Sequence, residues 1–255
     1  MYKGVQPRII PTLLLDEDVL VKTTKFKNSK YIGDPVNTVK IFNEFEVDEL
    51  CILDITQNLK STSINFNLLK EISEECFMPL SYGGGIRNIK EVEKLFSLGF
   101  EKVIINSAAF KDLELLKGIS KQFGNQALIG AIDVNKNLFG KLRVTSHSGK
   151  KSYKYDIFKW IDQLIECGIG EILLTSIYKE GTWEGMDFEL IEQITSKYSV
   201  PVIAHGGCSS ELDIRQAILE SGAQAVAIGN LCVYQGRNKG VLISVPKLEK
   251  ILSER

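Results

Sequence analysis

Two glycine turns contain the residues of this sequence best suited to holding an anion. Residues 79–87 (PLSYGGGIR) and 201–208 (PVIAHGGC) each begin with a proline, continue as a short apolar run and end in adjacent glycines, including Gly84 with Gly85 and Gly206 with Gly207. Because glycine has no Cβ, consecutive N–H groups in such a turn can point at one anion near the positive end of the following helix. One Gly-Gly pair is equally typical of an ordinary turn, but two copies in matching surroundings favour two phosphate sites.

The surroundings of the two turns repeat along the chain. Residues 50–56 and 102–107 flank the first turn as residues 171–176 and 225–230 flank the second. Each pair is about 120 residues apart, a period that indicates an internal repeat. We expect a single domain over residues 1–255, built from two similar halves of about 1–125 and 126–255. A ligand that spans both halves would carry two phosphates.

Length and composition limit the class of protein. The chain has 255 residues, 44% of them apolar, and one α/β barrel commonly takes about 250 residues. A net charge of −1 gives no sign of a nucleic-acid or membrane surface. The first apolar run, residues 9–15, contains Pro11 and precedes three acidic residues, so we expect neither a signal peptide nor a membrane span.

The cysteines and histidines indicate thiols rather than disulfides or metal. The five cysteines are odd in number and show no paired spacing, so reduced thiols in a cytoplasmic protein are the simplest interpretation. With two histidines and no Cys or His cluster, we expect no zinc site. The sequence suggests no cofactor.

Alternating strands and helices must position the two turns. Eight apolar runs predict parallel strands covered by helices on both faces, at residues 9–15, 49–55, 79–82, 102–106, 127–134, 171–175, 200–204 and 223–228. Helical spacing lies between them, at residues 35–45, 67–76, 89–98, 113–123, 157–167, 188–198 and 210–221. This order predicts a single-domain α/β fold, a (β/α)8 TIM barrel, with a doubly wound open sheet as the alternative. The twofold repeat favours the closed barrel.

The residues that end each strand are the candidates for chemistry, because barrel enzymes work at the C-terminal ends of their strands. They are residues 14–16, 83–85 and 205–207 with Asp54, Asn106, Asp133, Thr175, Gly229 and Asn230. The polar segment 135–154, which carries His147 and Ser148, is expected over this end. Residues 138–144 within it could form a small hairpin.

The order of several short motifs resembles the cyclase subunit of imidazole glycerol phosphate synthase, a phosphate-binding barrel of the histidine pathway. The motifs lie at residues 8–11, 33–35, 53–55, 83–87, 106–109, 131–133, 173–176, 181–182 and 206–207. The resemblance implies a lyase-type enzyme that takes ammonia from a partner glutaminase and adds it to a bisphosphorylated substrate. It implies anion-holding roles for Lys22, Gly84, Gly85, Asn106, Ser107, Gly206, Gly207, Gly229 and Asn230, with Asp54, Thr175 and His205 as further binding candidates.

The same resemblance implies two catalytic aspartates, of which this sequence keeps one. Asp133 ends the fifth strand as in the family, but Leu14 stands where the family has the aspartate of the first strand. A positioned carboxylate contributes about 10²- to 10⁴-fold to proton transfer, and leucine cannot replace it. Asp16, two residues further on, would point to the same face if the strand continued. A solvated loop position for Asp16 is the alternative.

Two further positions depart from the family near the second turn. His205 stands where a serine is usual, and Asn230 replaces a small hydroxyl residue. Both side chains can still donate a hydrogen bond to a phosphate. A histidine there also suits a different ligand, such as a nucleotide diphosphate, or a loop role without a ligand.

The opposite end of the barrel keeps the family's charged entrance for ammonia. The resemblance places Arg8, Glu49, Lys102 and Glu171 in one ring at the strand starts, with the same charge signs. Two cations and two anions in an apolar barrel must pair with one another, because a buried unpaired charge is costly. A plug that only seals the barrel floor is the alternative interpretation.

Three hypotheses for function follow. Residues 20–27 and 233–243 resemble barrel paralogues associated with amidation of bacterial surface sugars, which implies ammonia transfer to a phosphorylated or nucleotide-linked sugar with a glutaminase and a separate sugar-modifying amidotransferase as partners. The second hypothesis is the histidine-pathway cyclase itself, with Asp16 or a water in place of the missing acid. The third is a non-catalytic scaffold that conducts ammonia. No nucleic acid or membrane partner is expected.

Overall fold

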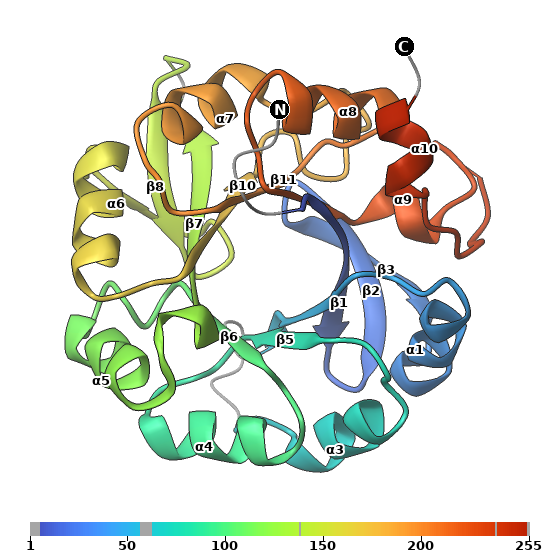
Figure 1. Cartoon of the computed structure of the whole chain (residues 1–255), viewed down its shortest axis with the longest axis horizontal. Coiled ribbons are helices and arrows are strands. Elements are labelled where there is room, and N and C mark those ends of the chain that lie inside the picture. Colours follow the sequence, from blue (N-terminus) through green and yellow to red (C-terminus); the bar gives the residue numbers. More distant parts are fainter. Residues whose placement is uncertain (1–5, 57–62, 138, 238, 254–255) are drawn as a thin grey trace.

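Eight parallel strands close into a barrel with helices around it (Figure 1). The computed structural model describes residues 6–56, 63–137, 139–237 and 239–253. The barrel strands are β1 (Arg8–Asp16), β4 (Leu50–Asp54), β5 (Leu80–Gly83), β6 (Lys102–Ile105), β7 (Leu128–Lys136), β10 (Glu171–Ser176), β11 (Val202–His205) and β12 (Ala225–Ile228). All eight predicted strands, and the predicted (β/α)8 barrel, are therefore confirmed.

Closure of the barrel depends on the pairing of β7 with β10. Glu171 lies beside Ile129 and Thr175 beside Asp133 in a parallel register, while β1 lies between β12 and β4. Side chains alternate across each strand. One set, such as Ile104, Ala131 and Leu173, forms a separate apolar cluster of small and branched residues. The alternate set packs in the larger cluster with the helices.

Each predicted helix begins at a side chain that caps it. The helices are α1 (Pro35–Glu44), α3 (Phe66–Glu74), α4 (Ile89–Ser97), α5 (Leu113–Phe123), α6 (Ile157–Glu166), α7 (Phe188–Thr195) and α8 (Glu211–Leu219). A side-chain oxygen just before each accepts a hydrogen bond from the first turn, which stabilises a helix start by about 1 kcal/mol. The capping residues are Asp34, Asn65, Asn88, Asp112, Asp156, Asp187 and Ser210.

A hairpin that the sequence analysis did not predict follows the first strand. β2 (Val19–Thr24) pairs antiparallel with the end of β1 and with β3 (Lys27–Gly33). The turn between β2 and β3 contains Lys25 and Phe26, both with positive φ. β3 is mostly exposed and polar, so it lacks the apolar run by which the barrel strands were recognised. The hairpin lies against the mouth of the barrel, where Thr23 and Phe26 line a cavity.

The polar segment after β7 forms a second antiparallel extension. β7 continues to Lys136 and pairs with β8 (Leu142–Ser146), which pairs with β9 (Lys151–Tyr153). The hairpin predicted within residues 138–144 was therefore misplaced, because its first strand is the end of β7, and residue 138 lies outside the described residues. His147, Ser148 and Gly149 all have positive φ and form the turn that reaches the mouth.

Three short helical elements complete the described chain: η1 (Asn125–Ala127), α9 (Asn230–Val233) and α10 (Leu248–Ser253). None of them was predicted. In the described ranges, no helix has both the length and the apolar character needed to cross a bilayer.

Candidate functional site

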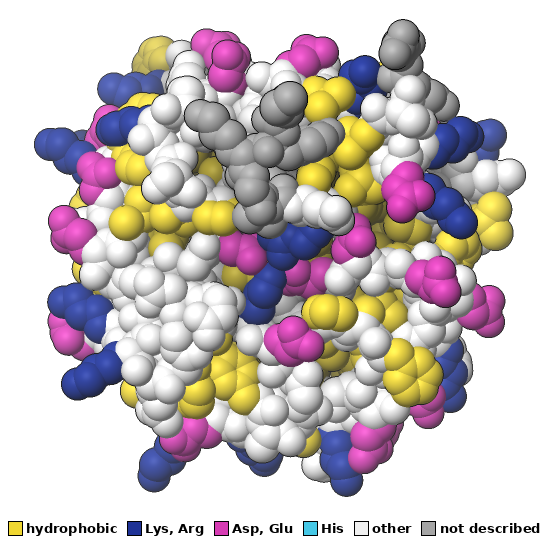
Figure 2. Space-filling view, in the orientation of Figure 1, with side chains coloured by type: hydrophobic (Ala, Val, Ile, Leu, Met, Phe, Trp, Pro, Cys, Tyr) yellow, Lys and Arg dark blue, Asp and Glu magenta, His cyan; other side chains and the backbone are white. Residues whose placement is uncertain are grey.

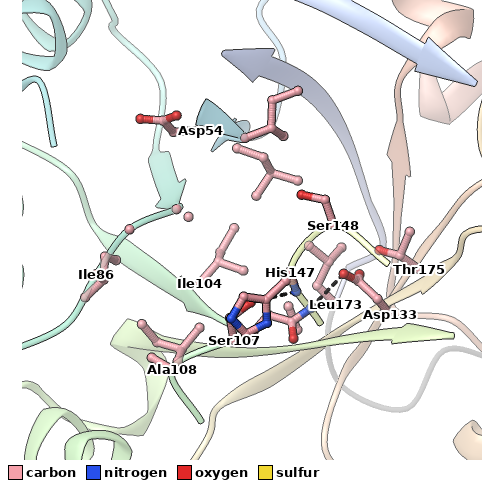
Figure 3. Close-up of a pocket in the computed structure, with 18 of the residues that line it drawn as sticks. Asp54, Ile86, Ile104, Ser107, Ala108, Asp133, His147, Ser148, Leu173 and Thr175 are labelled. Atoms are coloured by element: carbon pink, nitrogen blue, oxygen red, sulfur yellow. Dashed lines mark hydrogen bonds between the residues drawn. The ribbon is translucent and has the colours of Figure 1, made fainter. Parts of the chain in front are cut away.

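A cavity of about 530 Å³ opens where the barrel strands end. It collects eight of the residues that the sequence predicted for binding or catalysis, from β4, β5, β6, β7, β10 and β11. They are Asp54, Gly84, Gly85, Asn106, Ser107, Asp133, Thr175 and His205. Figure 3 shows Asp133 and Thr175 together on one side of this cavity and Asp54 on the other. Strand ends therefore bring together residues that are far apart in the sequence.

Asp133 is the carboxyl group of this cavity with the clearest acid–base properties. Asn106 Nδ2 donates to Asp133 Oδ2 at 2.7 Å, and Thr175 is its neighbour across the sheet. Burial raises the pKa of Asp133 to about 7, and hydrogen bonds from Thr175 and Asn106 offset only part of that rise. A carboxyl group with this pKa can both donate and accept a proton at neutral pH.

The first glycine turn faces the cavity and precedes a well-capped helix. Gly84 has φ 127°, and a Cβ there would lie 2.3 Å from the carbonyl oxygen of Asp54, so only glycine fits. The Asn88 side chain and Glu91 form a reciprocal capping box at the start of α4. Three cationic residues also line the cavity: Arg87, Lys111 and Lys150. This side of the mouth can therefore offer both N–H groups and positive charge to an anion.

The second glycine turn borders a small void next to the main cavity. Gly206, Gly207, Gly229 and Asn230 surround a separate void of about 10 Å³, which is the volume of about one water probe. A Cβ on Gly207 would lie 2.3 Å from the carbonyl oxygen of Gly185, so backbone packing already explains that glycine. Glu180 and His205 line both this void and the main cavity, so the two spaces adjoin, and the phosphate-binding role of these four residues stays a prediction. His205 alone of this group reaches the cavity wall.

Lys22 is buried beside Gly229 and is not among the residues that line the main cavity. Its side chain is 3% exposed, and its ammonium group donates to the carbonyl oxygen of Thr12 at 2.5 Å. Burial lowers the pKa of Lys22, and Cys232 and Glu180 only partly oppose that effect. The Lys22 Nζ also lies 3.0 Å from the position that a Cβ on Gly229 would take.

Glu180 is a buried carboxylate that the sequence analysis missed. It is 4% exposed, lines both the main cavity and the small void, and has Oε2 3.6 Å from His205 Nε2. Burial lowers the pKa of His205, so the imidazole is neutral at pH 7. Glu180 directly precedes the motif at residues 181–182, and its place in the loop after a strand was the signal that could have identified it.

Leu14 of β1 is an apolar residue at the position where the resemblance implies a second catalytic acid. Leu14 is 5% exposed and lines the cavity. β1 continues to Asp16, but that carboxylate lies outside the cavity wall formed by the described residues, with Thr56 Oγ1 3.5 Å from its Oδ1. Asp16 is therefore not placed to act with Asp133.

The turn after β8 brings a histidine to the mouth. The His147 N–H donates to Ser107 Oγ at 3.0 Å, and its Nδ1 lies 2.7 Å from Ser146 Oγ; Figure 3 shows the ring beside Ser107. Burial lowers the pKa of His147, as do the charges of Lys111 and Lys151. The sequence analysis placed this segment over the mouth but gave His147 no role.

The four charged residues at the other end of the barrel form one closed ring. Arg8 contacts Glu49 Oε2 at 2.8 Å and Glu171 Oε2 at 2.7 Å. Lys102 contacts the same two carboxylates at 2.9 Å each. Figure 2 shows side chains of both charge signs at the centre of this view of the barrel. The predicted ring is therefore present, with each cation bridging both anions.

The charges of the ring determine the protonation of its acids. Burial alone would raise the pKa of Glu171, but hydrogen bonds and charges from Arg8 and Lys102 lower it below its usual value.

In the described ranges, no three His, Cys, Asp or Glu side chains form a cluster that could hold a metal ion. The five cysteines are all unpaired thiols.

Comparison with known proteins identifies the family. The model of the histidine biosynthesis protein family matches residues 8–238. A Pseudomonas aeruginosa protein named "Putative imidazole glycerol phosphate synthase subunit hisF2" is 46% identical over 247 residues, which cover 97% of this chain and 98% of that protein. An Alkaliphilus metalliredigens protein named "Imidazole glycerol phosphate synthase subunit HisF" is 34% identical over 250 residues, 98% of this chain and 97% of that protein. The chain therefore belongs to the histidine biosynthesis protein family.

Proposed function

We propose that this chain is the cyclase-type synthase subunit of a glutamine amidotransferase, which uses ammonia at the barrel mouth on a phosphorylated substrate. The observation that carries the proposal is Asp133, a carboxyl group with a pKa of about 7 in the wall of the main cavity. Ammonia attack on a carbon centre requires protons to be removed from the nitrogen and delivered to a leaving group. A group that titrates near neutral pH suits both steps.

The charged ring supports delivery of ammonia from the opposite end. Arg8, Glu49, Lys102 and Glu171 lie where β1, β4, β6 and β10 begin, whereas Asp133 lies near the end of β7. The apolar cluster between the two ends includes Ile10, Ile129 and Ala225. A neutral molecule such as ammonia is compatible with that lining, while an ion is not. We propose a glutaminase as the partner that supplies ammonia at the ring.

Two acceptors are consistent with this site, and different observations favour each. The names of the relatives favour the bisphosphate substrate of imidazole glycerol phosphate synthase. Leu14 in the cavity wall favours another acceptor, because it removes the second acid that the family's cyclisation uses. We propose for this case a phosphorylated or nucleotide-linked sugar, which is amidated with the help of a separate amidotransferase.

A substitution at Leu14 tests which acceptor is correct. The purified chain is supplied with the formimino bisphosphate substrate of the histidine pathway and saturating ammonium, and imidazole glycerol phosphate is measured. We expect slow turnover in the unmodified protein and a gain of about 100-fold or more in Leu14→Asp, since a positioned carboxylate contributes at least that much. Leu14→Asn is the matched control, because asparagine has the size of aspartate but carries no ionisable group. Rapid turnover by the unmodified protein would contradict the proposal that a sugar is the ammonia acceptor.

A further inference from the structure

Four side chains at the strand ends form a continuous series of contacts that begins at Asp133. Thr175 hydrogen-bonds the carboxyl group of Asp133, and Thr175 Oγ1 lies 3.1 Å from His205 Nδ1. His205 Nε2 in turn lies 3.6 Å from Glu180 Oε2. Thr175 is the parallel neighbour of both Asp133 and His205, so the positions follow from the pairing of β7, β10 and β11. The series connects the proposed acid–base group to a second, buried carboxyl group.

The hydroxyl group of Thr175 cannot donate a hydrogen bond to both of its neighbours. A hydroxyl group has one hydrogen and two lone pairs. Thr175 therefore donates either to Asp133, while it accepts from His205 Nδ1, or to His205 Nδ1, while it accepts from Asp133. The first arrangement stabilises the carboxylate of Asp133, whereas the second stabilises its protonated form. The direction of one hydrogen bond thus favours either a base or an acid at Asp133.

The carboxylate of Glu180 selects between these two arrangements. Burial is the main cause of the lowered pKa of His205, with the charge of Lys22 acting in the same direction and that of Glu180 against it. The neutral imidazole carries one hydrogen, on either Nδ1 or Nε2. Glu180 lies next to Nε2, and a carboxylate there stabilises the tautomer with the hydrogen on Nε2. Nδ1 is then an acceptor and takes the hydroxyl hydrogen of Thr175.

The other surroundings of Asp133 agree with a protonated carboxyl group. Asn106 Nδ2 donates to Asp133 Oδ2 at 2.7 Å, which leaves Oδ1 to carry a proton. Burial opposes a charge on Asp133 most strongly, and the negative charge of Glu180 adds to that effect. Glu180 therefore favours the acid form of Asp133 both through its charge and through the hydrogen bonds of His205 and Thr175.

We propose that Glu180 and His205 are positioning residues that direct the Thr175 hydroxyl towards His205, so that Asp133 keeps a proton and acts first as a general acid. The proposal rests on the proposed function and deepens it by assigning the order of the proton transfers. The O–H bond of Asp133 breaks as its proton passes to the leaving group. The carboxylate that remains then takes a proton from the nitrogen that ammonia supplied, which restores the acid. One group serves both steps, in agreement with Leu14 in the cavity wall.

The position of the hydrogen on His205 is the first test, and it needs no substrate. The chain contains two histidines, so ¹⁵N labelling of histidine gives two rings in an NMR spectrum, which His147→Gln assigns. At about pH 6, where Asp133 is mainly protonated, we expect the hydrogen on Nε2 of His205. A hydrogen mainly on Nδ1 in the unmodified protein would overturn the proposal.

Glu180→Gln tests the part that Glu180 plays in the same spectrum. The amide of glutamine can donate as well as accept, so it no longer selects one tautomer. We expect a detectable fraction of His205 with its hydrogen on Nδ1. Glu184→Gln is the matched control, because Glu184 is exposed in the same loop, and it should leave the hydrogen on Nε2.

The isosteric variant Thr175→Val is the third test, because the sign of its effect differs between the two arrangements. If Thr175 accepts from Asp133, the variant removes a contact of the protonated form, and the acid dissociation constant of Asp133 should rise by about threefold or more. If Thr175 donates, the constant should fall. The more apolar valine also favours a fall, so it cannot cause the expected rise.

NMR of ¹³C-labelled aspartate measures this constant, with Asp133→Asn to assign the signal. Thr145→Val is the matched control, because Thr145 Oγ1 donates to the main-chain carbonyl oxygen of Asp133 at 3.2 Å. It should leave the constant unchanged.

Each outcome decides the proposal. A fall or no change of the dissociation constant in Thr175→Val would overturn it, as would a Glu180→Gln protein in which His205 keeps its hydrogen on Nε2 alone. If a variant does not fold, the hydrogen position in the unmodified protein still decides. Absence of ammonia-dependent turnover, with all three NMR results as expected, would instead contradict the proposed function and not the direction of this hydrogen bond.

Discussion

The pKa of a buried carboxyl group is shifted in opposite directions at the two ends of the barrel. At the strand starts, Glu171 lies between Arg8 and Lys102 and its pKa is lowered. At the strand ends, Asp133 is hydrogen-bonded to Asn106 and Thr175, which carry no charge, and its pKa is raised to about 7. Both acids are attached to neighbouring strands, β10 and β7, of one sheet. The chemical character of an acid in this fold therefore depends on its partners and not on its depth.

The ion pairs at the strand starts stabilise the barrel, whereas the carboxyl group of Asp133 at the strand ends can exchange a proton. Four charges that satisfy one another form a stable floor, because each carboxylate contacts both cations. Asp133 lacks such a cation, so its ionisation remains costly and its proton exchangeable at neutral pH.

The largest effect is expected from the loss of the acid at the mouth. Asp133→Asn should lower ammonia-dependent product formation by about 10²- to 10⁴-fold, since the amide cannot exchange the proton. Turnover with saturating ammonium, in the presence of the partner proteins, measures the change. Asp156→Asn, which alters only an exposed helix cap, is the control. Unchanged turnover in Asp133→Asn would favour the non-catalytic scaffold.

A loss of stability, rather than of chemistry, is expected at the floor. Arg8→Met leaves Glu49 and Glu171 with Lys102 as the remaining cation of the ring, and breaking a buried pair in this way costs about 3–5 kcal/mol of unfolding free energy. Urea unfolding measures this cost. The double variant with Glu171→Gln, which leaves Lys102 paired with Glu49, should recover most of it. Arg237→Met, at an exposed position, should change the stability by less than about 0.5 kcal/mol. A loss that small in Arg8→Met would contradict the pairing.

The smallest effect is a pH dependence with opposite signs at the two ends. Because the pKa of Asp133 rises from 3.8 to about 7 on folding, the native state binds more protons than the unfolded state between these values. Stability should therefore fall as pH rises, by about 2–3 kcal/mol between about pH 5 and about pH 8, since part of the fall has already occurred below pH 5. Asp133→Asn should abolish that fall in urea unfolding at about pH 5 and about pH 8.

Glu171 should show the reverse behaviour in the same experiment. Its pKa is lowered from 4.5 on folding, so its contribution to stability is present above that value and lost as pH falls through the lower native value. The cost of Glu171→Gln should therefore shrink in acid. The same sign of pH dependence for Glu171 and Asp133 would contradict the contrast between the ends.

The sequence predicted the barrel well because its signals are local and repeated. Apolar runs at residues 102–106 and 223–228 are visible without tertiary information, and a capping residue precedes each predicted helix. The β2–β3 hairpin was missed because β3 is polar and exposed. Its pairing with β1 depends on contacts that no periodic pattern records.

The site was only partly predictable for a related reason. Strand ends identified Asp133, Asn106 and Thr175, since topology alone brings such positions together. The surroundings of the two glycine turns differ, because the first lines the main cavity whereas the second lines a small void together with Glu180. A glycine motif predicts the backbone conformation of a turn, but it does not predict which residues from distant parts of the chain pack around that turn.

The capping side chains have a consequence for how the chain could be rearranged. Because every predicted helix from α1 to α8 carries its own start residue, such as Asp34 or Ser210, each strand–helix unit specifies its helix independently of the units before it. New ends introduced between two units, with the old ends joined, would leave all these start residues in place. The circular order of the units, rather than the point at which translation begins, defines this architecture.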